Sequence, residues 1–305
     1  MKIGISAQYD NEMQWVRKRI EILDPSIRCI SFNQLCTKPE LLDDLTFFLT
    51  IGGDGSVAWL VKAFFEFFGG LKQIPPIIPV VRPTSVGFLR QLDMSTPKAF
   101  ESGFSKILDG LGREIKRTVL QTEFNGKKFV AVNEIALFCQ PHLGEFTIQL
   151  DDTTLSQMRG DALFVLSSLG STAWGLSHHG AISVDEDALQ IVCVGGLPGT
   201  PNFVVPRRPV SIFCKLKNPV IVDSTIQAYQ RARTRSNLQK DEKPRETLLT
   251  IFDTRLVVDG KICGFGVAKI DIDSSMQIPF LSLTEEMPIT KASKLKDIFT
   301  GNKDS

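Results

Sequence analysis

Short apolar runs alternate with longer amphipathic stretches over the first hundred residues of the chain. The apolar runs that predict buried strands lie at residues 2–7, 27–31, 46–51 and 77–81. Between the first two runs, Met13, Val16 and Ile20 repeat at helical spacing, and a second helix is expected from Ser56 to Gly69. This alternation predicts a Rossmann-like α/β domain over residues 1–100, with a mostly parallel sheet covered by helices.

From about residue 113 the pattern changes to closely spaced short strands separated by turn residues. The expected strands lie at residues 129–132, 135–138, 146–150, 162–166, 190–194, 210–214, 220–222, 248–251, 256–258 and 267–272. Many short strands of this kind favour an antiparallel, sandwich-like β-rich domain, which we place at residues 101–283.

Composition narrows the class of partner. The chain has 305 residues, 43% of them hydrophobic, and a net charge of +1, so two domains with ordinary cores are expected. A near-neutral charge argues against general nucleic-acid binding. The six cysteines are scattered without metal-ligand spacing, so neither a zinc site nor a disulfide framework is expected.

The N-terminus enters its first apolar strand without a basic and apolar leader, and the chain has no unbroken apolar run of about 18 residues. A soluble cytoplasmic protein without a membrane partner is therefore expected. The charged segment 227–246 is typical of a solvated insertion.

The loop Gly52-Gly53-Asp54-Gly55 follows a predicted buried strand and precedes a helix that Ser56 is expected to open. Glycines let the backbone approach a phosphate chain and offer it N–H groups. Asp54 is the only group in the loop that can accept a proton. Neither the P-loop spacing nor the dinucleotide fingerprint is present. The loop therefore predicts phosphate binding by Gly52, Gly53, Gly55 and Ser56, with Asp54 as the catalytic residue.

Two further patches place polar residues inside apolar patterns. Asn133-Glu134 lies inside an apolar strand pattern, between the strands predicted at 129–132 and 135–138. Asp161 leads into another strand, which ends before the run Gly170-Ser171-Thr172-Ala173. Each patch alone fits a β-bulge or a turn.

Taken together in their order, these motifs resemble the NAD kinase family. The matching elements are Gly52-Gly53-Asp54-Gly55, Gly87-Phe88-Leu89, Asn133-Glu134, Gly160-Asp161, Gly170-Ser171-Thr172-Ala173 with Ser177, and Asp259-Gly260. The resemblance implies transfer of the terminal phosphate of ATP to the 2′-hydroxyl of the adenosine ribose of NAD. It also implies that the β-rich domain binds NAD and forms a homodimer or homotetramer, and that the C-terminal segment 284–305 rejoins the first domain.

The resemblance also assigns roles to single residues. Asp54 would be the base, Mg²⁺ would arrive with ATP, and no metal site of the protein itself is implied. The NAD-binding residues that it implies are Asn133, Glu134, Asp161, Thr172, Ala173, Trp174 and Ser177.

The chain departs from the family pattern in places. Leu169 and Trp174 replace a usual threonine and tyrosine, the stretch 82–85, which begins with Arg82, replaces small residues, and His178-His179 is unusual. Two other functions therefore stay open, a non-catalytic or regulatory dinucleotide-binding homologue and a kinase with a lipid or sugar acceptor. The sequence also leaves open ATP or polyphosphate as donor and NAD or NADH as acceptor.

Overall fold

The chain divides into two compact units. The computed structural model describes residues 1–85, 89–139, 143–183, 185–197, 199–216 and 254–283. Among the described residues, unit 1 comprises Met1–Arg117 and residues 277–283, and unit 2 lies within Thr118–Met276.

Unit 1 is built on a largely parallel sheet with strand order β2-β1-β3-β4-β19-β6, in which β5 also pairs with β4. Its strands are β1 (Lys2–Ala7), β2 (Arg28–Ser31), β3 (Leu45–Ile51), β4 (Ile77–Val81), β5 (Leu92–Asp93), β6 (Arg113–Thr118) and β19 (Gln277–Ser282). Its helices are α1 (Asp10–Leu23), α2 (Phe32–Thr37), the 3₁₀ turn η1 (Pro39–Leu41), α3 (Asp54–Phe68) and α4 (Pro97–Leu108).

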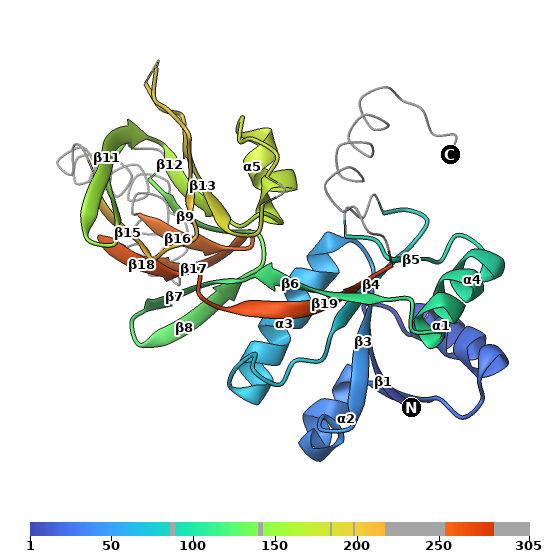
Figure 1. The fold of residues 1–305 in the computed structure, drawn as a ribbon. Helices are drawn as coiled ribbons and strands as arrows, with labels where there is room; N and C mark the ends of the chain where they lie inside the picture. The colour runs from blue at the N-terminus through green and yellow to red at the C-terminus, as the bar shows by residue number, and fades with distance from the viewer. Residues whose placement is uncertain (86–88, 140–142, 184, 198, 217–253, 284–305) are drawn as a thin grey trace, which may run out of the picture. The chain divides into compact units, whose positions relative to one another are not determined.

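Helices cover both faces of this sheet (Figure 1). On one face, α1 and α4 pack their apolar residues onto alternate residues of β1 and β3, and Phe104 lies in this core beside Ile5 and Phe47. On the other face, Phe48 contacts Phe32 at the start of α2. Because successive side chains of a strand point to opposite faces of the sheet, the apolar residues of each strand contribute to the cores on both faces.

Local sequence sets the helix ends. Ser31 and Gln34 form a reciprocal capping box at the start of α2. Thr96 caps α4 by accepting a hydrogen bond from the backbone N–H of Ala99 at 3.1 Å, with Pro97 in the first turn. Helix α3 ends at Gly69, whose φ of 70° is left-handed.

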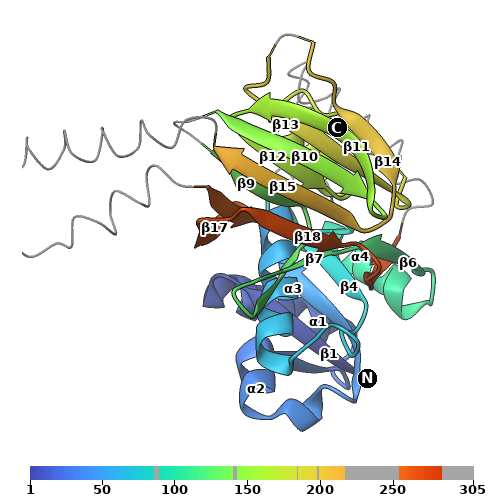
Figure 2. The same ribbon diagram turned by 90° about the vertical axis from the view of Figure 1, so that its left-hand side faces the viewer.

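The described residues of unit 2 form two antiparallel sheets that enclose one core (Figure 2). The first sheet has the order β11-β10-β15-β18-β7-β8 and the second β14-β13-β12-β9-β16-β17. The strands are β7 (Leu120–Phe124), β8 (Lys127–Ala131), β9 (Glu134–Phe138), β10 (Gly144–Leu150), β11 (Thr153–Gly160), β12 (Ala162–Leu166), β13 (Ala188–Val194), β14 (Phe203–Pro206), β15 (Val210–Leu216), β16 (Arg255–Val258), β17 (Lys261–Phe265) and β18 (Lys269–Asp273). The 3₁₀ turn η2 (Gly170–Thr172) and the short helix α5 (Trp174–Ser177) follow β12.

Among the described residues of unit 2, three two-residue turns with positive φ close hairpins. They are Asn125-Gly126 between β7 and β8, Asp151-Asp152 between β10 and β11, and Asp259-Gly260 between β16 and β17. Two consecutive residues with positive φ match the twist of the flanking strands, which explains the Asn, Asp and Gly found there.

The predicted fold class, an α/β domain followed by an antiparallel β-rich domain, is confirmed. The strands predicted at 2–7, 77–81 and 162–166 have the bounds of β1, β4 and β12. Those predicted at 220–222 and 248–251, together with the segments 227–246 and 284–305, lie outside the described residues.

From the sequence, we predicted that the second domain begins at residue 101 and that the chain rejoins the first domain at residue 284. The two compact units of the structure instead meet after Arg117 and before Gln277. Helix α4 packs on α1, and β6 extends the sheet of unit 1, so the chain leaves this unit only after Arg117. It returns at Gln277, because β19 pairs with β4. In the described part of the chain, no helix is long and apolar enough to cross a membrane.

Replacement of Phe104 by Ala tests the core of unit 1. Phe104 is fully buried and stacks on Phe100 with ring centroids 5.7 Å apart. Its loss leaves a cavity, so we expect the free energy of unfolding to fall by about 3–5 kcal/mol. Urea unfolding measures the change. Leu111→Ala is the control, because Leu111 is 66% exposed and should shift stability by less than about 0.5 kcal/mol.

Candidate functional site

The glycine loop makes a tight turn between β3 and α3. The N–H of Gly52 donates to the carbonyl of Val80 at 2.9 Å, and Gly52 has a φ of 145°. A Cβ on Gly52 would collide with the side chain of Ser56, so only glycine fits this position. Helix α3 begins at Asp54 with Gly53 as its N-cap, two residues before the start predicted at Ser56. Ser56 closes the first turn through its N–H to the carbonyl of Gly53 at 2.9 Å.

Asp54 lies in the first turn of α3, where the helix dipole favours a negative charge. Its Oδ1 accepts a hydrogen bond from the backbone N–H of Leu89 at 3.0 Å. Leu89 belongs to the second family motif element, and its neighbours Gly87 and Phe88 lie outside the described residues. The loop that follows β4 therefore fixes the orientation of the Asp54 carboxylate.

A cavity of about 660 Å³ opens beside the glycine loop within unit 1. It lies where β1, β3 and β4 end, and its lining includes Ser6, Gln8, Asn33, Ser56, Trp59 and Arg82 together with Gly53 and Gly55. Strand β1 pairs with β2 on one side and with β3 on the other, so the chain reverses its direction of winding here. Such switch points at the carboxyl ends of parallel strands are where open α/β sheets bind ligands.

In unit 2, the carboxylate of Asp259 holds the Asn133-Glu134 turn. It accepts hydrogen bonds from the backbone N–H groups of Val132 at 2.8 Å, Asn133 at 2.8 Å and Glu134 at 3.2 Å. The N–H of Asp259 in turn donates to the carbonyl of Glu134 at 3.0 Å. The motif elements Asn133-Glu134 and Asp259-Gly260, more than a hundred residues apart, thus form one structure. Asp259 anchors this structure, although the sequence identified it only as part of a motif.

Glu134 is a buried acid, with only 3% of its surface exposed. Its Oε2 has no hydrogen-bond partner within the described part of the chain. Burial, and secondarily the negative charge of Asp259, raise the pKa of Glu134 to about 8, against the opposing effect of the Gly260 backbone. At neutral pH the side chain therefore holds a proton that it can donate.

The Gly170 run packs directly against the same turn. The N–H of Ser167 donates to the carbonyl of Asn133 at 3.0 Å, and the N–H of Gly170 donates to the Ser167 hydroxyl at 3.2 Å. A Cβ on Gly170 would collide with the Asn133 carbonyl, which explains the glycine. The Thr172 hydroxyl donates to the carbonyl of Leu169 at 3.2 Å, while Leu169 itself is buried.

An aromatic cluster lies next to this run. The ring of Trp174, at the start of α5, lies 5.7 Å from both Phe138 and Phe164. Trp174 remains 40% exposed, so part of its surface is open to a ligand. His178 lies in the turn after α5, is partly exposed, and packs on Phe164 with 5.3 Å between ring centroids.

Asp161 lies between β11 and β12. Its N–H donates to the carbonyl of Val194, and its own carbonyl accepts from the N–H of Cys139, both at 2.7 Å. Gly195, with a φ of 64°, leaves the space that the Asp161 carboxylate fills. The backbone here is fixed by strands on both sides.

The predicted site residues fall into two groups. Asp54, Gly52, Gly53, Gly55 and Ser56 lie in unit 1. The residues predicted to bind NAD, namely Asn133, Glu134, Asp161, Thr172, Ala173, Trp174 and Ser177, lie in unit 2. Within unit 2, the Asn133-Glu134 turn and the Gly170 run are in contact.

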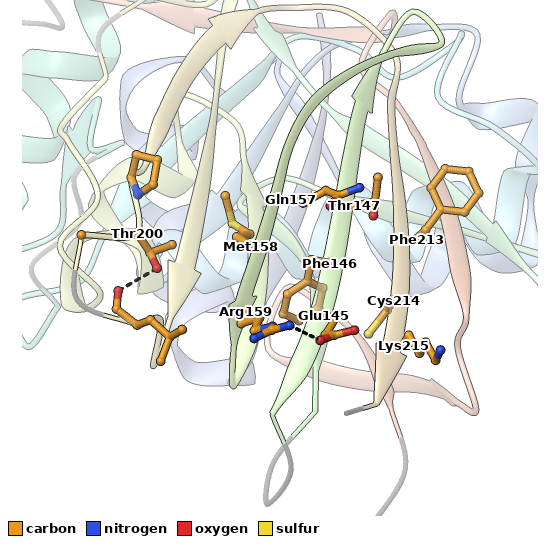
Figure 3. Close-up of a pocket in the computed structure, with 13 residues that line it drawn as sticks. Glu145, Phe146, Thr147, Gln157, Met158, Arg159, Thr200, Phe213, Cys214 and Lys215 are labelled. Carbon is orange, nitrogen blue, oxygen red and sulfur yellow. Dashed lines mark hydrogen bonds and ion pairs between the residues drawn. The ribbon is translucent and has the colours of Figure 1, made fainter. Parts of the chain in front are cut away.

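Sequence reasoning missed a second cavity, of about 700 Å³, in unit 2. Strands β10, β11 and β15 line it together with residues around Thr200, and Figure 3 shows Glu145 and Arg159 facing each other across two of these strands. Their ion pair measures 2.8 Å. None of the predicted site residues lines this cavity, and its walls come from segments too far apart in sequence to form a motif.

A largely parallel sheet followed by an antiparallel sandwich is also the fold of two solved structures. The crystal structure of an NAD kinase from Archaeoglobus fulgidus in complex with ATP matches with a TM-score of 0.68 and 19% identity, over 97% of this chain and 99% of that chain. Yeast NADH kinase complexed with NADH matches with a TM-score of 0.71 and 17% identity, over 100% of this chain and 89% of that chain. These matches show the fold.

Sequence comparison points the same way. A curated NAD kinase of Shewanella baltica strain OS155 is 28% identical over 230 residues, which cover 71% of this chain and 63% of that relative. One of Shewanella oneidensis is 30% identical over 204 residues, 63% of this chain and 60% of the relative. The matches span slightly less than two thirds of these relatives, and no family model matches the chain. Sequence and fold together confirm the resemblance to the NAD kinase family.

Asp259→Asn tests the anchor of the Asn133-Glu134 turn. An amide offers one acceptor oxygen where the carboxylate offers two, and its NH₂ group would face backbone donors. We expect the free energy of unfolding to fall by about 2–3 kcal/mol, measured by urea unfolding. Asp152→Asn is the matched control, since Asp152 also has a positive φ in a two-residue turn of unit 2. An equal loss in both variants would contradict the anchoring role.

Glu134→Gln tests the protonated acid through the pH dependence of stability. The folded-state pKa of Glu134 lies at about 8, above its ordinary value of 4.5, so its contribution to stability is complete below about pH 4.5. That contribution is lost as the pH rises through 8, whereas Gln does not titrate. We expect the variant to gain at least about 1 kcal/mol over the wild type between pH 5 and pH 8.5. A stability difference that does not change over this range would refute the raised pKa.

Proposed function

We propose that this chain is an ATP-dependent NAD kinase, which transfers the terminal phosphate of ATP to the 2′-hydroxyl of the adenosine ribose of NAD and forms NADP. The observation that carries the proposal is the Asp54 carboxylate, held by the N–H of Leu89 at the start of α3 inside a glycine loop. The curated relatives named NAD kinase support the same reaction.

Asp54 performs the proton chemistry of this reaction. Its carboxylate accepts a hydrogen bond from the ribose hydroxyl and orients that oxygen toward the terminal phosphorus. As the new oxygen–phosphorus bond forms, the bond to the oxygen that bridges the two last phosphates breaks. The proton passes to Asp54 and ADP leaves. Phosphoryl transfer has a loose transition state, so positioning by Asp54 matters more than basicity.

The other groups of the loop bind phosphate. The N–H groups of Gly53, Gly55 and Ser56 lie near the start of α3, and backbone donors of this kind stabilise charge that develops on the transferred group. Mg²⁺ bound to ATP would neutralise the phosphates, so the chain itself is not required to supply a complete metal site.

In unit 2, we assign the NAD contacts to the residues around the Asn133-Glu134 turn and α5. Protonated Glu134 donates a hydrogen bond to a ribose oxygen or a ring nitrogen, and the amide of Asn133 both donates and accepts. The exposed surface of Trp174 stacks on a planar ring. Asp161, Thr172, Ala173 and Ser177 complete the NAD contacts that we assign to unit 2.

We also propose that the protein forms a homodimer or a homotetramer and acts in the cytoplasm. Light scattering of the purified protein distinguishes these two assemblies. NADH is the second candidate acceptor, because the fold also matches a yeast NADH kinase at a TM-score of 0.71.

Asp54→Asn is the direct test. The amide keeps the shape of the side chain but cannot take the proton, so kcat for NADP formation from ATP, Mg²⁺ and NAD should fall by at least about 100-fold. Enzymatic cycling of NADP measures the rate. Asp44→Asn is the control, since Asp44 is an exposed acid of unit 1 that pairs with Lys2.

Three other outcomes separate the alternatives. Binding of NAD without turnover would favour a non-catalytic homologue. Phosphorylation of a lipid or a sugar, with NAD left unchanged, would favour another acceptor. Full activity of Asp54→Asn would remove Asp54 from the mechanism.

A further inference from the structure

Arg82 places a cation on the wall of the unit 1 cavity, directly after β4. Its guanidinium contacts Gln8 and Glu12, each at 3.4 Å, and lies 5.5 Å from the ring centroid of Tyr9. The chain departs from the family pattern at this residue, so the resemblance assigns it no role.

The contacts of Arg82 leave much of its hydrogen-bonding capacity unused. Both polar contacts are long for charge-assisted hydrogen bonds, which usually measure about 2.7–2.9 Å. Among the described residues, neither its Nε nor Oε2 of Glu12 has a hydrogen-bond partner, although both atoms are buried. A guanidinium carries five N–H donors in a planar fork that matches the oxygens of a phosphate. An anion in the cavity would supply the acceptors that Arg82 lacks.

Trp59 provides a second kind of surface in the same cavity. It lies on α3, shortly after the glycine loop, and is 54% exposed. Its ring meets Phe32 in an edge-to-face contact with centroids 5.5 Å apart, which holds the indole in place. An exposed, supported indole is a surface on which a planar base stacks.

We infer that this cavity binds the phosphate donor as a nucleoside triphosphate, with Arg82 on the phosphates and Trp59 against the base. The inference rests on the proposed kinase function, and it selects ATP over inorganic polyphosphate as the phosphate donor. Inorganic polyphosphate has no ring to stack, so it would use Arg82 and the glycine loop but not Trp59. A volume of about 660 Å³ suits a ligand of nucleotide size.

Calorimetric titration of the full-length protein with MgATP and with Mg-tripolyphosphate, both without NAD, tests the inference. Trp59→Ala should weaken ATP binding by about tenfold and leave tripolyphosphate binding unchanged. Arg82→Ala should weaken both ligands by about tenfold or more, and Arg82→Lys should restore part of the loss, because lysine keeps the charge but not the fork.

The chain offers matched controls for both residues. Phe67 is another exposed aromatic of α3 that contacts Phe32, at 5.9 Å, but it does not line the cavity. Arg19 resembles Arg82, with a glutamate at 3.4 Å and a Trp15 ring at 5.6 Å, and likewise lies outside it. Phe67→Ala and Arg19→Ala should bind both ligands as the wild type does. Thermal melting of every variant shows that it is folded.

The outcomes separate this inference from the proposed function. Unchanged ATP affinity in folded Trp59→Ala and Arg82→Ala overturns the inference, even where the wild type makes NADP. Equal loss of both ligands in Trp59→Ala overturns the assignment of the base to Trp59. The inference is supported, even where NAD is not phosphorylated, if both variants lose ATP affinity and only Arg82→Ala also loses tripolyphosphate affinity.

Discussion

The turn at Gly52 is the constraint on which the first unit depends. The chain must leave β3, in the middle of the sheet, and enter α3 within two residues, and the side chain of Ser56 occupies the space that a Cβ on Gly52 would need. This close approach brings Asp54 into the first turn of the helix and points the glycine backbone at the cavity. The same residues therefore set both the path of the chain and the chemistry of the loop.

In unit 2, a carboxylate fixes the path of the chain at the turn before β9. The turn before β9 exposes three successive N–H groups, and one side chain, Asp259, satisfies all of them. Its charge is one reason why Glu134 holds its proton, since two ionised carboxylates in this buried place would repel each other. A structural anchor thereby tunes a neighbouring functional group.

The sequence predicted those elements whose signal is local. Continuous apolar runs gave β1, β4 and β12 with correct bounds, and the glycine loop was recognised from composition and position. Strand β7 was missed because it is short and polar on one face, and β17 because it is short and largely exposed. The Asn125-Gly126 and Asp259-Gly260 turns beside them are nevertheless strong hairpin signals.

Helix α4 was missed too, and its cap of Thr96 followed by Pro97 was a readable start signal. The strands β6 and β19 carried no comparable signal, since each is defined by pairing with distant segments. The same holds at the site. The three hydrogen bonds of Asp259 and the contacts of Arg82 with Gln8 and Glu12 join residues 70 or more positions apart, which no local pattern encodes.

Buried charge is handled in opposite ways at the two candidate sites. The guanidinium of Arg82 pairs with Glu12, 70 positions away in the sequence, whereas the raised pKa of Glu134 keeps that side chain protonated. Each arrangement leaves a buried polar atom without a hydrogen-bond partner among the described residues, and each such atom costs stability. Well-packed apolar residues would avoid both costs. The proposed ligands would complete this hydrogen bonding, an anion for Arg82 and a hydrogen-bond acceptor for Glu134.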